Sequence, residues 1–260
     1  MAAVTAGFTS SGRAQEQTGF LNRAVAVDGV DHRYQVYLPA DYSRARRWPV
    51  ILFLHGSGEQ GTDGLLQTGV GLGEAIRRHA ARWPAIVVFP QAPPGHRWHG
   101  KVAHLALTTL DRTLHEFSTD GDRVYLVGLS AGGNGAWNLA YRYPERFAAL
   151  VAVCGWVTPT ADRREAIVPP DSGPPHRLIA ERVRSLPAWI WHGGADNVVP
   201  VEESRRMAQA LHGAGGQVTY TELPGVGHDA WTPALESPEL PGWLLGQHRR
   251  SRGSPRCSEG

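Results

Sequence analysis

The chain has 260 residues, of which 42% are hydrophobic and 19% are charged, and its formal net charge is +2. This apolar content is enough for a sizeable buried core, whereas a disordered chain would be more charged and less apolar. Most basic residues are scattered arginines. The only basic cluster, Arg249, Arg250, Arg252 and Arg256, lies in a C-terminal segment that also contains Ser, Gly and Pro. We therefore expect no nucleic-acid partner.

The two cysteines and the N-terminus bear on the cellular compartment. Cys154 lies in an apolar stretch and Cys257 near the C-terminus, a pattern that does not predict a disulfide framework. The first residues lack the basic segment and apolar stretch of a signal peptide, and no apolar run has the length of a membrane helix. These features predict a cytoplasmic protein without a membrane partner, although a mis-set start codon would hide a signal. They leave the oligomeric state open.

The chain contains no internal repeat and no interior linker. We expect residues 1–18 and 249–260 to be disordered and residues 19–248 to form a single domain. The first predicted strand is His32–Leu38, where polar and apolar residues alternate. The continuous apolar run Pro49–Leu54 predicts a strand that is covered on both faces. A helix is predicted at Gly71–Arg82 and another buried strand at Ala85–Phe89.

The second half repeats the alternation of strands and helices. Further strands are predicted at Arg123–Val127, Phe147–Val153, Pro187–Trp191 and Gln217–Leu223, and helices at Val102–Phe117, Asn134–Tyr143, Val201–Leu211 and Glu239–Gln247. This order predicts an α/β fold with a mostly parallel central sheet and helices on both faces. The strands before the first helix are expected to form an antiparallel edge. The segment 157–186 is short and rich in Pro, Asp and Arg, so we expect no large lid.

The strongest chemical signal is the pentapeptide Gly128–Gly132, GLSAG, between a predicted strand and a predicted helix. It matches G-x-S-x-G, in which the serine sits on a sharp strand-to-helix turn and exposes its hydroxyl at the edge of the sheet. Glycine is needed two positions either side, because a side chain there would collide with the turn or the neighbouring strand. The pattern predicts Ser130 as a nucleophile.

A serine nucleophile needs a general base, and that base needs a group to orient it. In this arrangement the chain order is Ser, then Asp or Glu, then His. Asp196 follows the strand Pro187–Trp191 and His228 follows the strand Gln217–Leu223, so both are expected at the sheet edge that carries Ser130. Asp229 is the rival acid, disfavoured because a residue adjacent to His228 reaches back to the same imidazole awkwardly.

An acyl-transfer site also needs donors for the oxyanion. We expect these to be the backbone N–H groups of Ala131, after the nucleophile, and of Ser57, in the loop after the strand Pro49–Leu54. Three tryptophans, Trp98, Trp156 and Trp231, are expected in loops around Ser130, where they would form the substrate pocket. His96, His99 and His104 lie close in sequence, but no Asp or Cys completes a ligand set, so no metal is expected.

These segments resemble those of a known family. The stretches Trp48–Gly61, Phe89–Pro94, Val124–Gly133, His192–Pro200 and Leu223–Trp231 are similar to those of carboxylesterase/phospholipase-like α/β hydrolases, often labelled predicted peptidases. This group is related to dienelactone hydrolases and polyhydroxybutyrate-depolymerase-like esterases. The resemblance implies the α/β-hydrolase fold and the triad Ser130, Asp196 and His228.

The chain departs from that family pattern at two positions. Gln60 stands where the family often has arginine, and Trp156 where it often has glycine, so the family's substrates cannot be transferred directly. Dienelactone hydrolases use a cysteine nucleophile, whereas position 130 is serine.

The predicted function is that of a serine carboxylic-ester hydrolase. It would act without a cofactor on small esters with short acyl or aryl groups. Two alternatives remain open: a serine peptidase or amidase that acts on small substrates, and a catalytically inactive binding module on the same fold.

Overall fold

The computed structural model describes residues 17–162, 164–169 and 171–249. The ends expected to be disordered lie almost wholly outside these residues, as does Cys257. At the boundaries, Gly19 begins the first strand, and the backbone N–H of Arg249 donates to the carbonyl of Asp122 at 2.8 Å.

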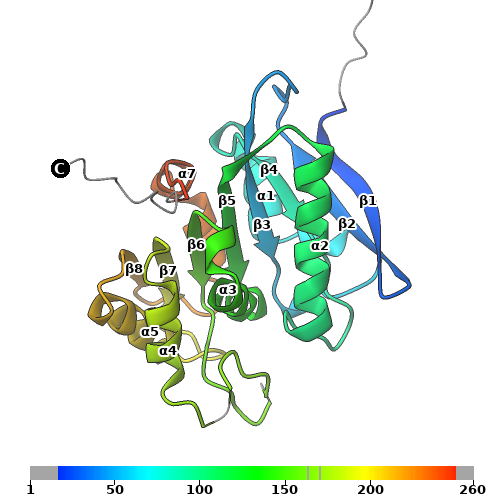
Figure 1. The fold of residues 1–260 in the computed structure, drawn as a ribbon. Helices are drawn as coiled ribbons and strands as arrows, with labels where there is room; N and C mark the ends of the chain where they lie inside the picture. The colour runs from blue at the N-terminus through cyan, green and yellow to red at the C-terminus, as the bar shows by residue number, and fades with distance from the viewer. Residues whose placement is uncertain (1–16, 163, 170, 250–260) are drawn as a thin grey trace, which may run out of the picture.

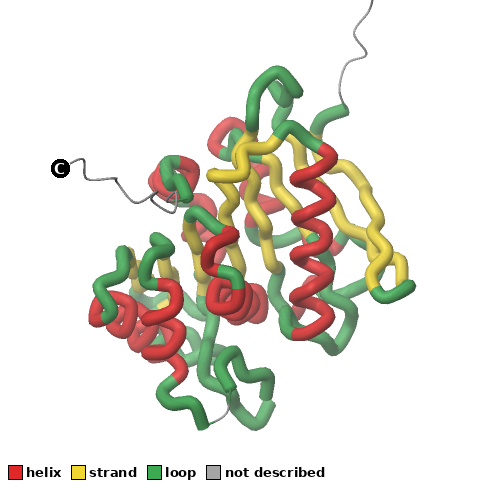
Figure 2. Tube along the Cα trace, in the orientation of Figure 1, coloured by secondary structure: helices red, strands yellow, loops and turns green. Residues whose placement is uncertain are grey.

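The described chain forms one eight-stranded sheet and seven α-helices (Figures 1 and 2). The strands are β1 (Gly19–Val27), β2 (Val30–Leu38), β3 (Trp48–Leu54), β4 (Ile86–Phe89), β5 (Thr119–Leu129), β6 (Ala149–Val153), β7 (Ala188–Gly193) and β8 (Val218–Leu223). The helices are α1 (Leu72–His79), α2 (Gly100–Glu116), α3 (Ala131–Arg142), α4 (Pro175–Val183), α5 (Glu202–Gly213), α6 (Trp231–Glu236) and α7 (Glu239–Leu245). None of these helices has the length and apolar character needed to cross a bilayer.

The strand order is β1-β2-β4-β3-β5-β6-β7-β8. The first two strands pair antiparallel and β2 pairs antiparallel with β4, whereas all pairs from β4 to β8 are parallel. Since parallel strands end at one edge of the sheet, the loops after β3, β5, β6, β7 and β8 meet there. This is the edge at which open α/β sheets bind ligands.

Helices cover both faces of the sheet. Even-numbered residues of the central strands, such as Leu52 and Leu126, pack in a core under α2, α3, α4 and α5. Odd-numbered residues, such as Ile51 and Val127, pack in a second core under α1, α6 and α7. Alternation of side chains along a strand therefore places neighbouring residues in different cores. The predicted mostly parallel sheet with helices on both faces is confirmed.

The expectation of an antiparallel edge is correct only in part. β1 and β2 form that edge, but β3, which also precedes the first helix, lies between β4 and β5 and pairs parallel with both. All seven residues of β3 are buried, which requires neighbours on both sides and helices on both faces.

Three elements were not predicted from the sequence patterns. The strand β1 has one edge free and a mixed burial pattern, so its alternation is weak. The helix α4 lies in the segment 157–186, where no helix was predicted, and α6 is only six residues long. Short helices are held mainly by tertiary packing rather than by their own propensity, so their sequences carry little signal.

Candidate active site

Ser130 lies at the turn between β5 and α3, with φ 51° and ψ −117°. A positive φ is uncommon for a residue with a side chain, and it is held here by a hydrogen bond from the Ser130 N–H to the carbonyl of Val153, at 2.9 Å. This geometry lifts the Ser130 hydroxyl out of the sheet at the carboxyl edge.

The glycines of the pentapeptide are explained by close packing. A Cβ at Gly128 would collide with the carbonyl of Gly132, within the turn itself, and a Cβ at Gly132 would collide with the carbonyl of Leu54, at the end of β3. The expected reason for glycine at both positions is therefore confirmed: the turn and the neighbouring strand leave no room for a side chain.

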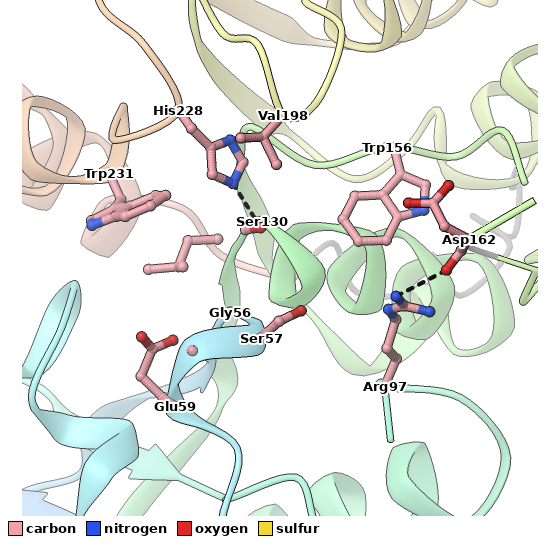
Figure 3. A pocket seen from close by; sticks show the side chains of 12 residues that line it. Gly56, Ser57, Glu59, Arg97, Ser130, Trp156, Asp162, Val198, His228 and Trp231 are labelled. Carbon is pink, nitrogen blue, oxygen red and sulfur yellow. Dashed lines mark hydrogen bonds between the residues drawn. The ribbon is translucent and has the colours of Figure 1, made fainter. Parts of the chain in front are cut away.

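His228 and Asp196 join Ser130 in a continuous hydrogen-bonded chain. The Ser130 Oγ lies 2.9 Å from His228 Nε2, and His228 Nδ1 lies 2.7 Å from Asp196 Oδ2. Figure 3 shows the imidazole directly above the serine. Backbone hydrogen bonds from Gly194 to Leu223 and from Ala195 to Val226 join the loops after β7 and β8, which hold Asp196 and His228 together.

The Asp196 carboxylate is fully buried and makes several hydrogen bonds. Its Oδ1 accepts from the N–H groups of Val198 and Val199, at 2.8 and 2.9 Å. Burial acts to raise the pKa of this carboxyl, but the hydrogen bonds from His228 and the two N–H groups outweigh burial and lower the pKa. Asp196 is therefore ionised at neutral pH, as a group that stabilises an imidazolium must be.

The rival acid has a different partner. Asp229 is exposed, and its Oδ1 accepts from the Thr232 N–H at 3.2 Å, in the first turn of α6. Of the two carboxylates, the structure brings Asp196 onto the imidazole of His228.

Two residues beside the triad were not found from the sequence. His192, on β7, is fully buried, and its Nε2 lies 3.2 Å from Asp196 Oδ2. The Cys154 Sγ lies within 4.8 Å of a carboxylate oxygen of Asp196 and of a ring nitrogen of His228. Burial raises the pKa of the Cys154 thiol, so it stays protonated beside the triad and is a poor metal ligand. His192 is the last but one residue of β7 and Cys154 directly follows β6, positions that mark the edge of a sheet but not contact with a particular side chain.

The histidines that lie close together in the sequence are His96 and His99, before α2, and His104, within it. The first two contact other groups of the protein instead of one another. His99 Nε2 lies 2.7 Å from Asn134 Oδ1, and His96 Nδ1 lies 2.9 Å from the carbonyl of Pro94. Burial lowers the pKa of His99. Within the described residues these side chains are not brought together as a ligand set.

The loop expected to supply an oxyanion donor lies beside Ser130, since a Cβ built on Gly56 would be 3.5 Å from Ser130 Cβ. Ser57 begins a short 3-10 helix and Ala131 begins α3, so neither backbone N–H has a partner within its own helix. His55 supports this loop: its Nδ1 lies 2.6 Å from the carbonyl of Gly56, and its Nε2 accepts from the Ala92 N–H at 3.0 Å. Burial lowers the pKa of His55 to about 4, so the ring is neutral and donates from Nδ1.

A cavity of about 390 Å³ opens over Ser130 (Figure 3). Trp156 and Trp231 line it, as the sequence predicts, on opposite sides of the serine. The prediction for Trp98 is wrong. Its side chain is 1% exposed, its Nε1 donates to the carbonyl of His55, and it packs behind the loop rather than facing the cavity.

The polar lining of the cavity was also missed. Glu59, Arg97 and Asp162 line it beside the apolar Val198, and all four come from loops whose composition does not show which residues face inward. Arg97 donates to the carboxylate of Glu165 at 3.0 Å and to the carbonyl of Asp162 at 3.2 Å.

Comparison with known proteins agrees with this architecture. The model of the Esterase family, described as "Putative esterase", matches residues 28–223. A solved structure of a thermostable esterase is 31% identical, with a TM-score of 0.76, and the match covers 88% of this chain and 63% of that one. The fold is thus that of the α/β hydrolases.

Two curated relatives are more distant. An uncharacterized secreted protein of Arthroderma benhamiae is 24% identical over 82% of this chain, and esterase YjfP of Escherichia coli is 27% identical over 58%. The chain spans a quarter of the length of the first relative and 74% of the second. Since the family model matches most of the chain, including Ser130 and Asp196, this protein belongs to the Esterase family of α/β hydrolases.

Proposed function

We propose that the protein is a serine carboxylic-ester hydrolase that acts through an acyl-enzyme intermediate. The observation that carries the proposal is the chain of hydrogen bonds from Ser130 through His228 to Asp196. Ser130 and His228 also line a cavity. A lone serine hydroxyl is a weak nucleophile, and this arrangement activates it. Membership of the Esterase family supports the same reaction.

The reaction follows from the positions of the donors and acceptors. His228 Nε2 takes the proton as Ser130 Oγ attacks the ester carbonyl, and the imidazolium is stabilised by Asp196. The N–H groups of Ser57 and Ala131 stabilise the oxyanion. His228 then protonates the leaving alcohol, and water attacks the acyl-enzyme in the reverse sequence to release the acid.

The cavity supports small substrates. At about 390 Å³ it lies near the lower end of the range for ligand sites, and the walls formed by Trp156 and Trp231 are rigid and aromatic. Such walls favour a compact acyl group, with about two to six carbons, or an aryl group over a long flexible chain.

Ser130→Ala tests the assignment of the nucleophile. We expect kcat for p-nitrophenyl acetate to fall by roughly 10⁶-fold, to the background rate, because no other nucleophile replaces the serine. Labelling by a fluorophosphonate probe should be lost with it. The exposed Ser185→Ala serves as the matched control and should retain both properties. Retention of more than a few per cent of activity by the purified Ser130→Ala protein would show that the nucleophile is misassigned.

A further inference from the structure

The cavity contains a carboxylate that the proposed reaction does not use. Glu59 lines it on the same side as Trp231, across the cavity from Arg97 (Figure 3). Its side chain is 14% exposed. A Cβ built on Gly56 would lie 3.2 Å from Glu59 Oε2 and 3.5 Å from Ser130 Cβ, so these two atoms lie within about 7 Å of each other. A substrate group a few bonds from the scissile carbonyl can therefore reach Glu59.

No cation of the described chain neutralises Glu59. Its ion-pair contact is with His55, whose Nδ1 is 4.0 Å away and whose ring is neutral at neutral pH. Desolvation raises the pKa of Glu59, and the nearby N–H groups of Gly56 and Glu59 offset this only in part. A desolvated carboxylate without a full set of donors is unfavourable, and a ligand that brings a donor relieves that cost.

The position of Glu59 relative to the triad indicates which half of the ester reaches it. The leaving alcohol must lie beside His228, which protonates it. Glu59 belongs to the loop below Ser130 in Figure 3, across the site from His228, so the acyl half lies closer to it.

We propose, on the basis of the proposed esterase function, that Glu59 is a specificity-determining residue for the acyl group. It accepts a hydrogen bond from a hydroxyl or ammonium group about two to four bonds from the scissile carbonyl. It also disfavours acyl groups that carry a carboxylate at that position, because two like charges at this separation repel each other in a partly desolvated site.

Three matched ethyl esters, followed by pH-stat at neutral pH, test the proposal: ethyl butyrate, ethyl 3-hydroxypropanoate and monoethyl succinate. For the wild type we expect kcat/KM to be highest for the hydroxyl ester. We expect it to be lower for monoethyl succinate than for ethyl butyrate, by about tenfold or more. Glu59→Gln, which removes the charge but keeps an acceptor, should abolish most of the discrimination against the succinate ester. Glu59→Met, which removes both, should also abolish the preference for the hydroxyl ester.

The control variant is Glu74→Gln, the same change at an exposed ion pair on α1, and both selectivity ratios should remain at their wild-type values. The proposal is overturned if both Glu59 variants keep the wild-type ratios, or if the wild type prefers the succinate ester. Failure of the esterase function itself gives a different result, namely no hydrolysis of any of the three esters that depends on Ser130.

A second inference rests on independent contacts, those of the buried His192. Its Nε2 faces two acceptors, the carbonyl of Val199 at 3.0 Å and Asp196 Oδ2 at 3.2 Å, and its Nδ1 lies 2.7 Å from Ser204 Oγ. Because burial lowers the pKa of His192, the ring carries one proton at neutral pH. The two acceptors require that proton on Nε2, so Nδ1 accepts from the Ser204 hydroxyl.

The geometry points to His192 as a positioning residue for the triad acid, with Ser204 selecting its tautomer. The His192 Nε2–H group is then shared between the carbonyl of Val199 and Asp196 Oδ2, the atom that also accepts from His228 Nδ1. The His192 N–H holds the Asp196 carboxylate in place and takes up part of its negative charge. The carboxylate therefore stabilises the His228 imidazolium less than it would if His228 were its only histidine donor.

His192→Met keeps a buried side chain of comparable size without the donor, and His192→Gln restores an amide donor. For His192→Met we expect kcat to fall by about tenfold or more with little change in KM. The acid limb of the pH profile of kcat/KM should move to higher pH. His192→Gln should recover part of both properties, and Ser204→Ala should show the same changes in smaller measure. If His192→Met folds, wild-type kcat and an unshifted acid limb overturn the inference. If it does not fold, wild-type behaviour of Ser204→Ala does so.

Discussion

Asp196 and Asp229 are the two carboxylates that compete for the role of orienting His228. The Asp196 carboxylate is buried and hydrogen-bonded to the imidazole, whereas Asp229 is exposed and accepts from the Thr232 N–H, in the first turn of α6. We therefore expect Asp196→Asn to lower kcat on the order of 10⁴-fold, because the amide favours the wrong tautomer of His228. Asp229→Asn should lower kcat by less than tenfold. Steady-state kinetics of the two variants checks this ranking, and the reverse order would contradict the assigned acid.

Trp156 is the wall residue expected to limit the length of the acyl group. It is buried against Ala131 and Val199, and it lines the cavity together with Ser130. For the wild type we expect kcat/KM to fall steeply beyond about six acyl carbons. Trp156→Gly should flatten that profile by opening the cavity. Measurement with p-nitrophenyl esters from acetate to laurate tests this. Trp243→Gly, on α7, is the control for a large-to-small change and should keep the wild-type profile. A wild-type preference for laurate would refute the model of the pocket.

At the scale of elements, the helix α5 anchors the loop that carries Trp156. Glu203, in its first turn, accepts from the N–H groups of Val157 and Thr158, at 2.8 and 3.1 Å, and lies 3.4 Å from His176 Nε2. Burial acts to raise the pKa of this carboxyl, but these partners lower it from 4.5 to about 2. This partly buried carboxylate thus links α5 to the wall of the proposed pocket.

This link makes part of the stability depend on pH. Because the pKa of Glu203 is lower in the folded state, its contribution is fully present above pH 4.5 and is lost as the pH falls towards 2. The shift corresponds to about 3 kcal/mol. Glu203→Gln should therefore destabilise the protein at pH 6 by a few kcal/mol at most and by much less at pH 3, as measured by urea unfolding. The neighbouring, exposed Glu202→Gln is the control. Equal destabilisation by Glu203→Gln at both pH values would exclude the predicted linkage.

At the scale of the whole molecule, two cores share one sheet. Ile51 and Leu52 are adjacent on β3 and fully buried, but they lie in opposite cores. If residues 19–248 form a single domain, Ile51→Ala and Leu52→Ala should each lower one common thermal transition. Each substitution should lower the free energy of unfolding by about 2 to 5 kcal/mol. Each kcal/mol lost should lower the Tm by roughly 2 to 4 °C.

Differential scanning calorimetry checks this prediction. The exposed Leu66→Ala should shift the transition very little. Appearance of a second transition in either core variant would show that the two cores unfold independently, and the single-domain prediction would then be wrong.

The sequence by itself determined the local features of the site. The apolar run before Gly128, the glycines around Ser130 and the helical pattern after it together specify a strained strand-to-helix turn. Each of these signals acts over a few residues, through backbone sterics and the two periodicities of strand and helix. The strand ends before Asp196 and His228 are equally local. Because parallel strands end at one edge, the sequence could bring these residues to the same edge without knowledge of their neighbours in the sheet.

Only the tertiary structure decided which groups meet at that edge. A buried pattern shows that a residue is covered but does not show which residues cover it. For this reason β3 was assigned to the antiparallel edge, and Trp98 was assigned to the cavity although it packs behind the loop that borders the cavity. The same holds for His192 and Glu59: their contacts with Asp196 and with the cavity depend on side-chain directions set by packing across distant segments. Such contacts arise from the relative positions of whole elements, which no short stretch of sequence encodes.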